Sequence, residues 1–163
     1  MRILRGALAG AIAGLVGALV MERFQALWTR TAERIQPPQT ARAAEDGPAT
    51  VRAAERVTDK LVHATLPEEV KPVAGEIVHY GMGTLSGAIY GAIAERIPVA
   101  RAGNGLVFGT ILWWLADETA VPALRLSKPP SAYPPSTHAY ALASHLVYGF
   151  VTETVRRLLR LVP

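Results

Sequence analysis

The fold is decided by two apolar stretches, ALAGAIAGLVGALV at residues 7–20 and ILWWL at residues 111–115. Neither stretch has a polar face at the helical period of 3.6 residues. A helix that is apolar around its whole circumference is buried in a large protein or in a membrane. A chain of 163 residues is too small to enclose several such helices by itself. These stretches therefore favour a membrane protein over a soluble helical bundle.

Four apolar runs of this kind divide the chain, at about residues 3–21, 73–94, 103–124 and 137–155. Roughly 20 helical residues cross a ~30 Å hydrocarbon core, so each run suffices when the polar residues near its ends lie at headgroup depth. We therefore predict an all-α, polytopic membrane protein. It consists of a single membrane domain with four transmembrane helices.

The first run also resembles a signal peptide, because Arg2 and Arg5 precede its apolar residues. A signal peptide ends in a small-x-small cleavage site, and the residues after Val20 do not provide one. We therefore predict a retained anchor. Apolar residues continue at helical spacing as far as Ile35, so this helix is expected to extend beyond the membrane face.

The long connection after the first run is expected to contain one amphipathic helix. Pro37-Pro38 should end the first helix, and a loop containing Gly47-Pro48 should follow. Apolar residues then recur at helical spacing within about residues 49–66, with charged residues between them. This helix should lie on the membrane surface or pack on the ends of the bundle.

The composition excludes several classes of function. The chain has no cysteine, so disulfides, thiolate catalysis and cysteine-bound metals are absent. The net charge is +4, but the basic residues lie at the ends of apolar runs and do not alternate with aromatic residues. Basic residues in that position anchor a helix to anionic headgroups, and we interpret Arg156, Arg157 and Arg160 in this way. Binding of nucleic acid is therefore not expected.

The arginines also indicate an orientation. Four crossings place both chain ends on one side, together with the short connection that holds Arg96 and Arg101. Short cytoplasmic segments are enriched in Lys and Arg. We therefore expect both termini to be cytoplasmic.

Small residues recur every four positions in three of the runs. In a membrane, helices associate through close backbone packing, and stripes of glycine allow it. We expect these glycines to lie at helix–helix contacts, within the chain or between copies, in the manner of a glycine zipper. They are Gly6, Gly10 and Gly14, then Gly83, Gly87 and Gly91, and finally Gly105 and Gly109.

Three groups of polar motifs interrupt the runs. They are His79-Tyr80-Gly81-Met82-Gly83-Thr84; Gly105-Leu106-Val107-Phe108-Gly109-Thr110 leading to Trp114-Leu115-Ala116-Asp117-Glu118; and His138-Ala139-Tyr140 with Ser144-His145-Leu146-Val147-Tyr148-Gly149. Together they resemble the YagU-like family of bacterial inner-membrane proteins, over most of the chain. The resemblance implies an inner-membrane location and a loose link to acid tolerance. That family has no known function, so the resemblance implies no catalytic residue.

The topology places several protonatable residues in the same half of the membrane. Ionisable groups inside a membrane are costly and are often functional. We expect a cluster on the bundle axis, with Glu76 and His79 on one helix face and with only one of the adjacent Asp117 and Glu118 facing inward. The candidate residues are Glu76, His79, Asp117, Glu118, His138 and His145.

Three functions stay open at this point. The first is a non-enzymatic membrane protein with a structural, stress-related or assembly role, in which the polar residues lie at headgroup depth or satisfy each other. The second is a proton- or metal-handling protein that uses the cluster, because Glu-x-x-His with carboxylates on other helices is a metal-site pattern. The third is a haem-carrying subunit with His79 and His145 as axial ligands. The expected partners are the lipid bilayer and either further copies of the chain or a larger membrane complex.

Overall fold

The computed structural model describes residues 1–35 and 48–161, and within these ranges it contains helices and no strand. The all-α class predicted from the sequence is confirmed. The predicted break at Pro37-Pro38 and the loop at Gly47 lie outside the described residues. The helices and helical turns are α1 (Arg2–Ile35), α3 (Ala49–Val62), α4 (Lys71–Ala94), η1 (Pro98–Gly105), α5 (Leu106–Leu115), η2 (Ala116–Ala120), α6 (Val121–Ala123), η3 (Pro130–Ala132) and α7 (Pro135–Leu161).

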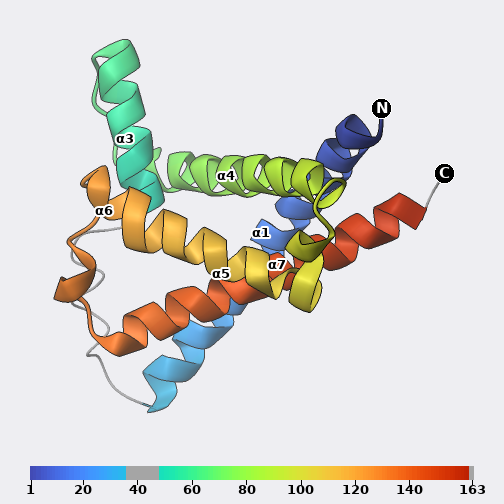
Figure 1. Cartoon of the computed structure of the whole chain (residues 1–163). Coiled ribbons are helices and arrows are strands. Elements are labelled where there is room, and N and C mark those ends of the chain that lie inside the picture. The colour runs from blue at the N-terminus through green and yellow to red at the C-terminus, as the bar shows by residue number, and fades with distance from the viewer. Residues whose placement is uncertain (36–47, 162–163) are drawn as a thin grey trace.

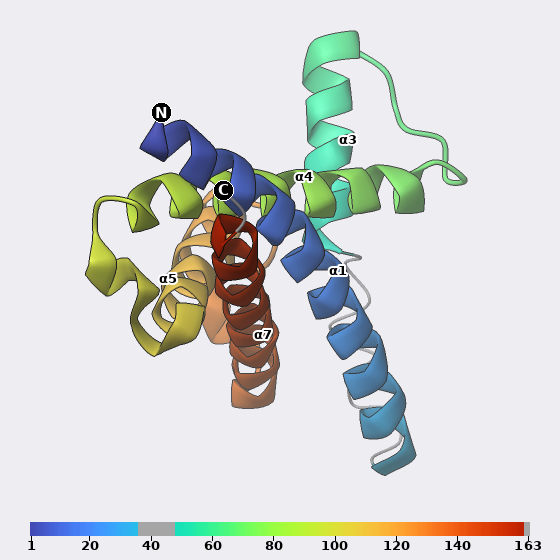
Figure 2. The same ribbon diagram turned by 90° about the vertical axis from the view of Figure 1, so that its right-hand side faces the viewer.

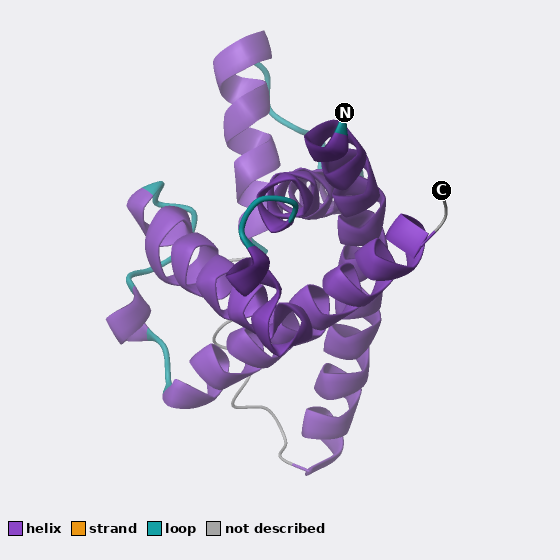
Figure 3. Ribbon diagram, turned by 45° about the vertical axis from the view of Figure 1, so that its right-hand side comes forward, coloured by secondary structure: helices purple, strands orange, loops and turns teal. Residues whose placement is uncertain are grey.

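Helix α1 joins the bundle together, because it packs against both α4 and α7, while α5 packs along α7 (Figures 1 and 2). The two chain ends lie at the same end of the molecule (Figure 3). As expected, α1 continues beyond its apolar run to Ile35. By length and composition, Arg2–Thr31 is the one helix in the described part of the chain that passes a simple test for a membrane span. A signal sequence passes the same test.

The contact between α1 and α4 is made by glycines on both helices. A Cβ atom on Gly10 would lie less than 3.0 Å from the carbonyl oxygen of Gly87, and one on Gly87 would be as close to the carbonyl oxygen of Gly10. Gly6 and Gly91 meet in the same way, and a Cβ atom on Gly14 would lie less than 3.0 Å from the carbonyl oxygen of Gly83. The backbones of the two helices therefore touch along the whole stripe. Because no side chain separates them, α1 and α4 can cross at the shortest possible distance.

A second glycine contact joins α5 to α7. Gly109 lies against the carbonyl oxygen of His145, and Gly149 lies against Gly105 and Gly109. A Cβ atom on Gly109 or Gly149 would come closer than 3.0 Å to backbone of the other helix. This contact sets the distance across which the polar side chains of η2, which follows α5, meet those of α7.

The third apolar run differs from the prediction, because it is not one regular helix over residues 103–124. Gly103, Asn104 and Gly105 have positive φ angles of 61°, 52° and 87°, so α5 begins only at Leu106. Glycine adopts this left-handed region without strain, and asparagine tolerates it. Asn104 is held by a 2.8 Å hydrogen bond from Nδ2 to Oγ1 of Thr154. A second irregularity, the π-helical turn η2, separates α5 from α6.

Helix α3 stands beside the start of α4 and projects from the bundle (Figure 1). It is shorter than the predicted 49–66, because His63 takes a left-handed φ of 52° that ends the helix. Its apolar face packs on α4 through Val51 and Gly75. Lys71 lies 2.8 Å from Glu55 and 2.5 Å from Glu68, and these hydrogen bonds raise the pKa of its ammonium group.

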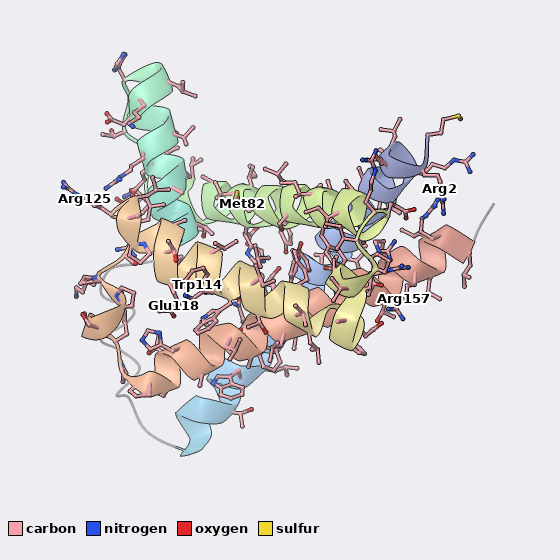
Figure 4. The ribbon with its side chains drawn as sticks, viewed as in Figure 1. Arg2, Met82, Trp114, Glu118, Arg125 and Arg157 are labelled. Atoms are coloured by element: carbon pink, nitrogen blue, oxygen red, sulfur yellow. The ribbon has the colours of Figure 1, made fainter. Side chains whose placement is uncertain are left out.

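Large apolar side chains are more frequent on the surface of the described residues than in the interior. Buried positions are filled mostly by Gly, Ala and polar side chains such as Ser144, Thr152 and Glu153. Large aliphatic and aromatic side chains lie on the outside of every long helix (Figure 4). More than half of the surface is exposed for Leu4, Leu8, Ile12, Val73, Ile77, Met82, Leu85, Ile89, Ile111 and Trp114.

Candidate functional site

The π-helical turn η2 carries two neighbouring carboxylates, Asp117 and Glu118. At its end, the N–H of Val121 donates to the carbonyl oxygen of Ala116, five residues earlier. Pro122 follows and has no N–H to continue a regular ladder. Wide turns of this kind inside a helix are often found at functional sites.

The first of two polar pairs joins Glu118 to His138, near the start of α7. Nδ1 of His138 lies 2.6 Å from Oε1 of Glu118, and Nε2 lies 3.1 Å from the carbonyl oxygen of Pro130. A histidine ring has donors on both nitrogens only in its protonated form. With an acceptor at each nitrogen, this environment suits an imidazolium ion paired with a carboxylate.

The second pair joins Asp117 to His145, two turns further along α7. Nδ1 of His145 lies 3.5 Å from Oδ2 of Asp117 and 3.0 Å from the carbonyl oxygen of Ala141. The expectation that only one of the two carboxylates faces inward is wrong. Both carboxylates lie within the π turn and both reach α7, where the two histidines that they meet are seven residues apart on one helix face.

The single six-residue cluster expected from the sequence is also not formed. Glu76 is exposed, and Nε2 of His79 lies 3.3 Å from the carbonyl oxygen of Ala18 on α1. The ring of His79 lies against Tyr80, whereas that of His145 lies between Ala141 and Asp117. The face of α4 that carries its glycines is held against α1, so α4 does not turn its polar residues toward η2. Within the described ranges, no three His, Asp or Glu side chains converge where one metal ion could be held.

A different polar cluster lies at the end of the bundle where both chain ends are found. We call it the ion-pair network, and it consists of Tyr90, Glu95, Glu153, Arg156 and Arg160. Arg156 donates from Nε and Nη2 to the two carboxylate oxygens of Glu153 at 2.7 and 3.0 Å, and Oη of Tyr90 donates to the same carboxylate at 2.8 Å. Arg160 binds Glu95 through Nε and Nη2 at 3.0 and 3.2 Å. The network joins α4 to α7.

The interpretation of Arg156 as a lipid anchor is therefore wrong. Arg156 is 3% exposed and Glu153 is fully buried, so this pair belongs to the interior. Arg157 reaches Glu153 at 2.5 Å but leaves half of its side chain exposed. The spacing of Glu153 and Arg156, three residues apart on one helix, was the signal that could have revealed the pair.

A comparison with protein-family models finds a match that covers most of the chain. Residues 24–154 match the model described as a protein of unknown function, DUF1440. The chain belongs to this family. The match covers both polar pairs and the glycine contact between α5 and α7, and it assigns no activity to them. The glycines of α1 precede the matched residues. No match was found among curated proteins or among solved structures.

Proposed function

We propose that this chain is a small protein of the bacterial inner membrane, related to the YagU-like proteins, with four membrane-crossing helices and both ends in the cytoplasm. The placement of large apolar side chains on the surface carries this proposal. Exposed aliphatic residues follow the length of α1, α4 and α5 and the C-terminal end of α7, whereas mostly Gly, Ala and polar groups fill the interior. In water a surface of this kind promotes aggregation, whereas in lipid it is the favoured surface.

The lengths of the helices agree with four crossings. The 24 residues of α4 and the 27 of α7 span roughly 36 and 40 Å at 1.5 Å per residue. The segment from α5 through α6, Leu106 to Ala123, spans roughly 27 Å at the same rise. Each is close to the ~30 Å hydrocarbon thickness or exceeds it.

The role that we propose is non-enzymatic, namely structural, stress-related or in the assembly of membrane complexes. Two features support it. The buried charged groups bind one another in the ion-pair network, and the glycine contacts hold the helices together. The exposed aliphatic surface is then free to contact lipid, a second copy or a larger membrane complex.

The topology is tested by extraction and by reporter fusions. We expect the protein to stay in the membrane fraction in alkaline carbonate and to need detergent for release. A reporter fused after Pro163 should be active in the cytoplasm, and one inserted after the exposed Ala64 should be active on the outer side, because the arginine-rich ends stay inside. A cytoplasmic signal from both positions would remove the four-crossing topology, and release by carbonate would remove the membrane location.

A second candidate function is proton exchange, and the two His–carboxylate pairs on η2 and α7 favour it. Glu118–His138 and Asp117–His145 place two titratable pairs along one face of α7. Each pair joins a carboxylate and an imidazole, two groups that can exchange a proton with each other. We therefore propose them as two separate proton sites, in place of the single cluster that the sequence suggested.

Histidine NMR in detergent tests the pairs individually. We expect Glu118→Gln to move the pH midpoint at which the ring of His138 titrates, and to leave His145 unchanged. Asp117→Asn should have the opposite pattern. Exposed His63, after α3, is the internal control and should keep its midpoint in both variants. If neither substitution changes the midpoint of its partner, the pairs are not proton sites.

A further inference from the structure

Six arginines surround the end of the bundle that holds both chain ends. Three segments supply two each, and Figure 4 labels one from each of the two helix ends, Arg2 and Arg157. We call them the arginine collar: Arg2, Arg5, Arg96, Arg101, Arg157 and Arg160. Contacts hold the segments together, because Glu95 lies against Gly6 of α1 and binds Arg160 of α7. Nη2 of Arg157 also lies 3.5 Å from the carbonyl oxygen of Arg101.

Among the described residues, the carboxylates at this end pair with only two of the collar arginines, Arg157 and Arg160. Glu153 is buried and pairs with Arg156 and Arg157, and Glu95 is shared by Arg156 and Arg160. Within the described ranges, no carboxylate lies at salt-bridge distance from Arg2, Arg5, Arg96 or Arg101. Arg2, Arg5, Arg96 and Arg157 are exposed. The collar therefore presents a positive charge to an external partner.

Exposed aliphatic side chains alternate with these arginines on each of the three segments. Leu4 is 65% exposed beside Arg5, Val99 is 72% exposed beside Arg101, and Leu158 is 58% exposed beside Arg157. The segments contain no aromatic residue on which a nucleic acid base could stack. A surface that offers guanidinium groups next to aliphatic side chains fits an amphiphile with an anionic head and an acyl chain.

We propose that the arginine collar binds the phosphate headgroups of anionic phospholipids in the cytoplasmic leaflet. This inference depends on the proposed membrane location. The ion-pair network has a supporting part, since Glu95 and Glu153 hold the end of α7 against α4 and so fix the positions of Arg157 and Arg160. Arginine is well suited to phosphate because its fork of N–H donors can bind two oxygens at once.

The test measures the affinity of the detergent-purified full chain for chain-labelled phosphatidylglycerol in mixed micelles, with labelled phosphatidylcholine as the neutral comparison. We expect preferential binding of phosphatidylglycerol that weakens with added salt. Each basic residue near an anionic surface contributes about a fivefold factor in affinity. The triple variant Arg2→Gln, Arg5→Gln and Arg101→Gln should therefore bind phosphatidylglycerol on the order of 100-fold more weakly. None of the three arginines makes a described side-chain ion pair, so this variant should still fold.

The matched control is Arg30→Gln, which removes an exposed arginine from the opposite end of α1 and should leave the affinity unchanged. Equal affinity for the two lipids, or an unchanged triple variant, would overturn the proposal. So would a tighter complex with an RNA oligonucleotide, or full displacement of the lipid by inorganic phosphate, which would show that the acyl chain does not matter. Carbonate extraction separates this proposal from the proposed membrane location. A protein that resists carbonate but shows no headgroup preference refutes lipid binding by the collar and leaves the membrane location standing.

Discussion

Glu153→Ala is expected to lower the free energy of unfolding by about 3–5 kcal/mol, the range for removing one partner of a buried ion pair. Glu153 is fully buried and accepts hydrogen bonds from Tyr90, Arg156 and Arg157. Without it, the guanidinium of Arg156 stays in the interior, and Glu95 at 3.3 Å is the one carboxylate left to it among the described residues. Helix α7 should separate from α4 at this end, which far-UV circular dichroism during thermal unfolding in detergent would detect.

Two further variants isolate the cause of that loss. Glu69→Ala removes an exposed glutamate from the turn before α4 and should change stability by less than about 0.5 kcal/mol. The double variant Glu153→Leu with Arg156→Met replaces both charges by apolar groups of similar size. It should be more stable than Glu153→Ala, because no unpaired charge is left in the interior. If Glu153→Ala has the same unfolding temperature as the unmodified protein, the pair is exposed to water in solution and the network does not hold α7.

The positions of the long helices could be predicted from the sequence, because the apolar runs of α1, α4 and α7 end at charged or proline residues. The break before α5 could not. Gly103 and Gly105 were counted among the apolar residues, whereas in the fold they supply positive φ angles next to Asn104. A glycine within an apolar run serves equally for close packing and for a turn, and tertiary contacts decide between the two.

For the candidate site, the sequence indicated the residue types but not their partners. Spacing along one helix shows which residues share a face, but not how that helix is rotated toward its neighbours. The rotation of α7 is set by Gly109 and Gly149, which bring the backbone of α5 against it and place His138 and His145 opposite η2. The rotation of α4 is set by its contact with α1, which leaves Glu76 outside.

The same limitation hid the ion-pair network. His145, Tyr148, Thr152 and Arg156 are three or four residues apart in sequence and form one buried face of α7. In the sequence that face looked like the end of an apolar run followed by an anchoring tail. Its polar character becomes informative only when Tyr90 and Glu95 of the neighbouring segment are known to meet it.

Gly87→Ile is expected to separate α1 from α4. Even the first added carbon would lie closer than 3.0 Å to the carbonyl oxygen and Cα atom of residues on α1, and backbone cannot move aside as a flexible side chain can. Overpacking of this kind costs about 1–3 kcal/mol or more. The better helix propensity of isoleucine returns less than about 1 kcal/mol. The net effect should be a lower unfolding temperature in detergent, together with a changed oligomeric state if copies associate through the loosened helices.

The matched control is Gly81→Ile, in the same helix and with the same change of side chain. A Cβ atom on Gly81 would meet nothing within 4 Å, so only the gain in helix propensity applies. We therefore expect opposite signs: Gly81→Ile should leave the unfolding temperature unchanged or raise it, whereas Gly87→Ile should lower it. Equal effects of the two substitutions would mean that α4 does not use its glycine stripe to contact α1.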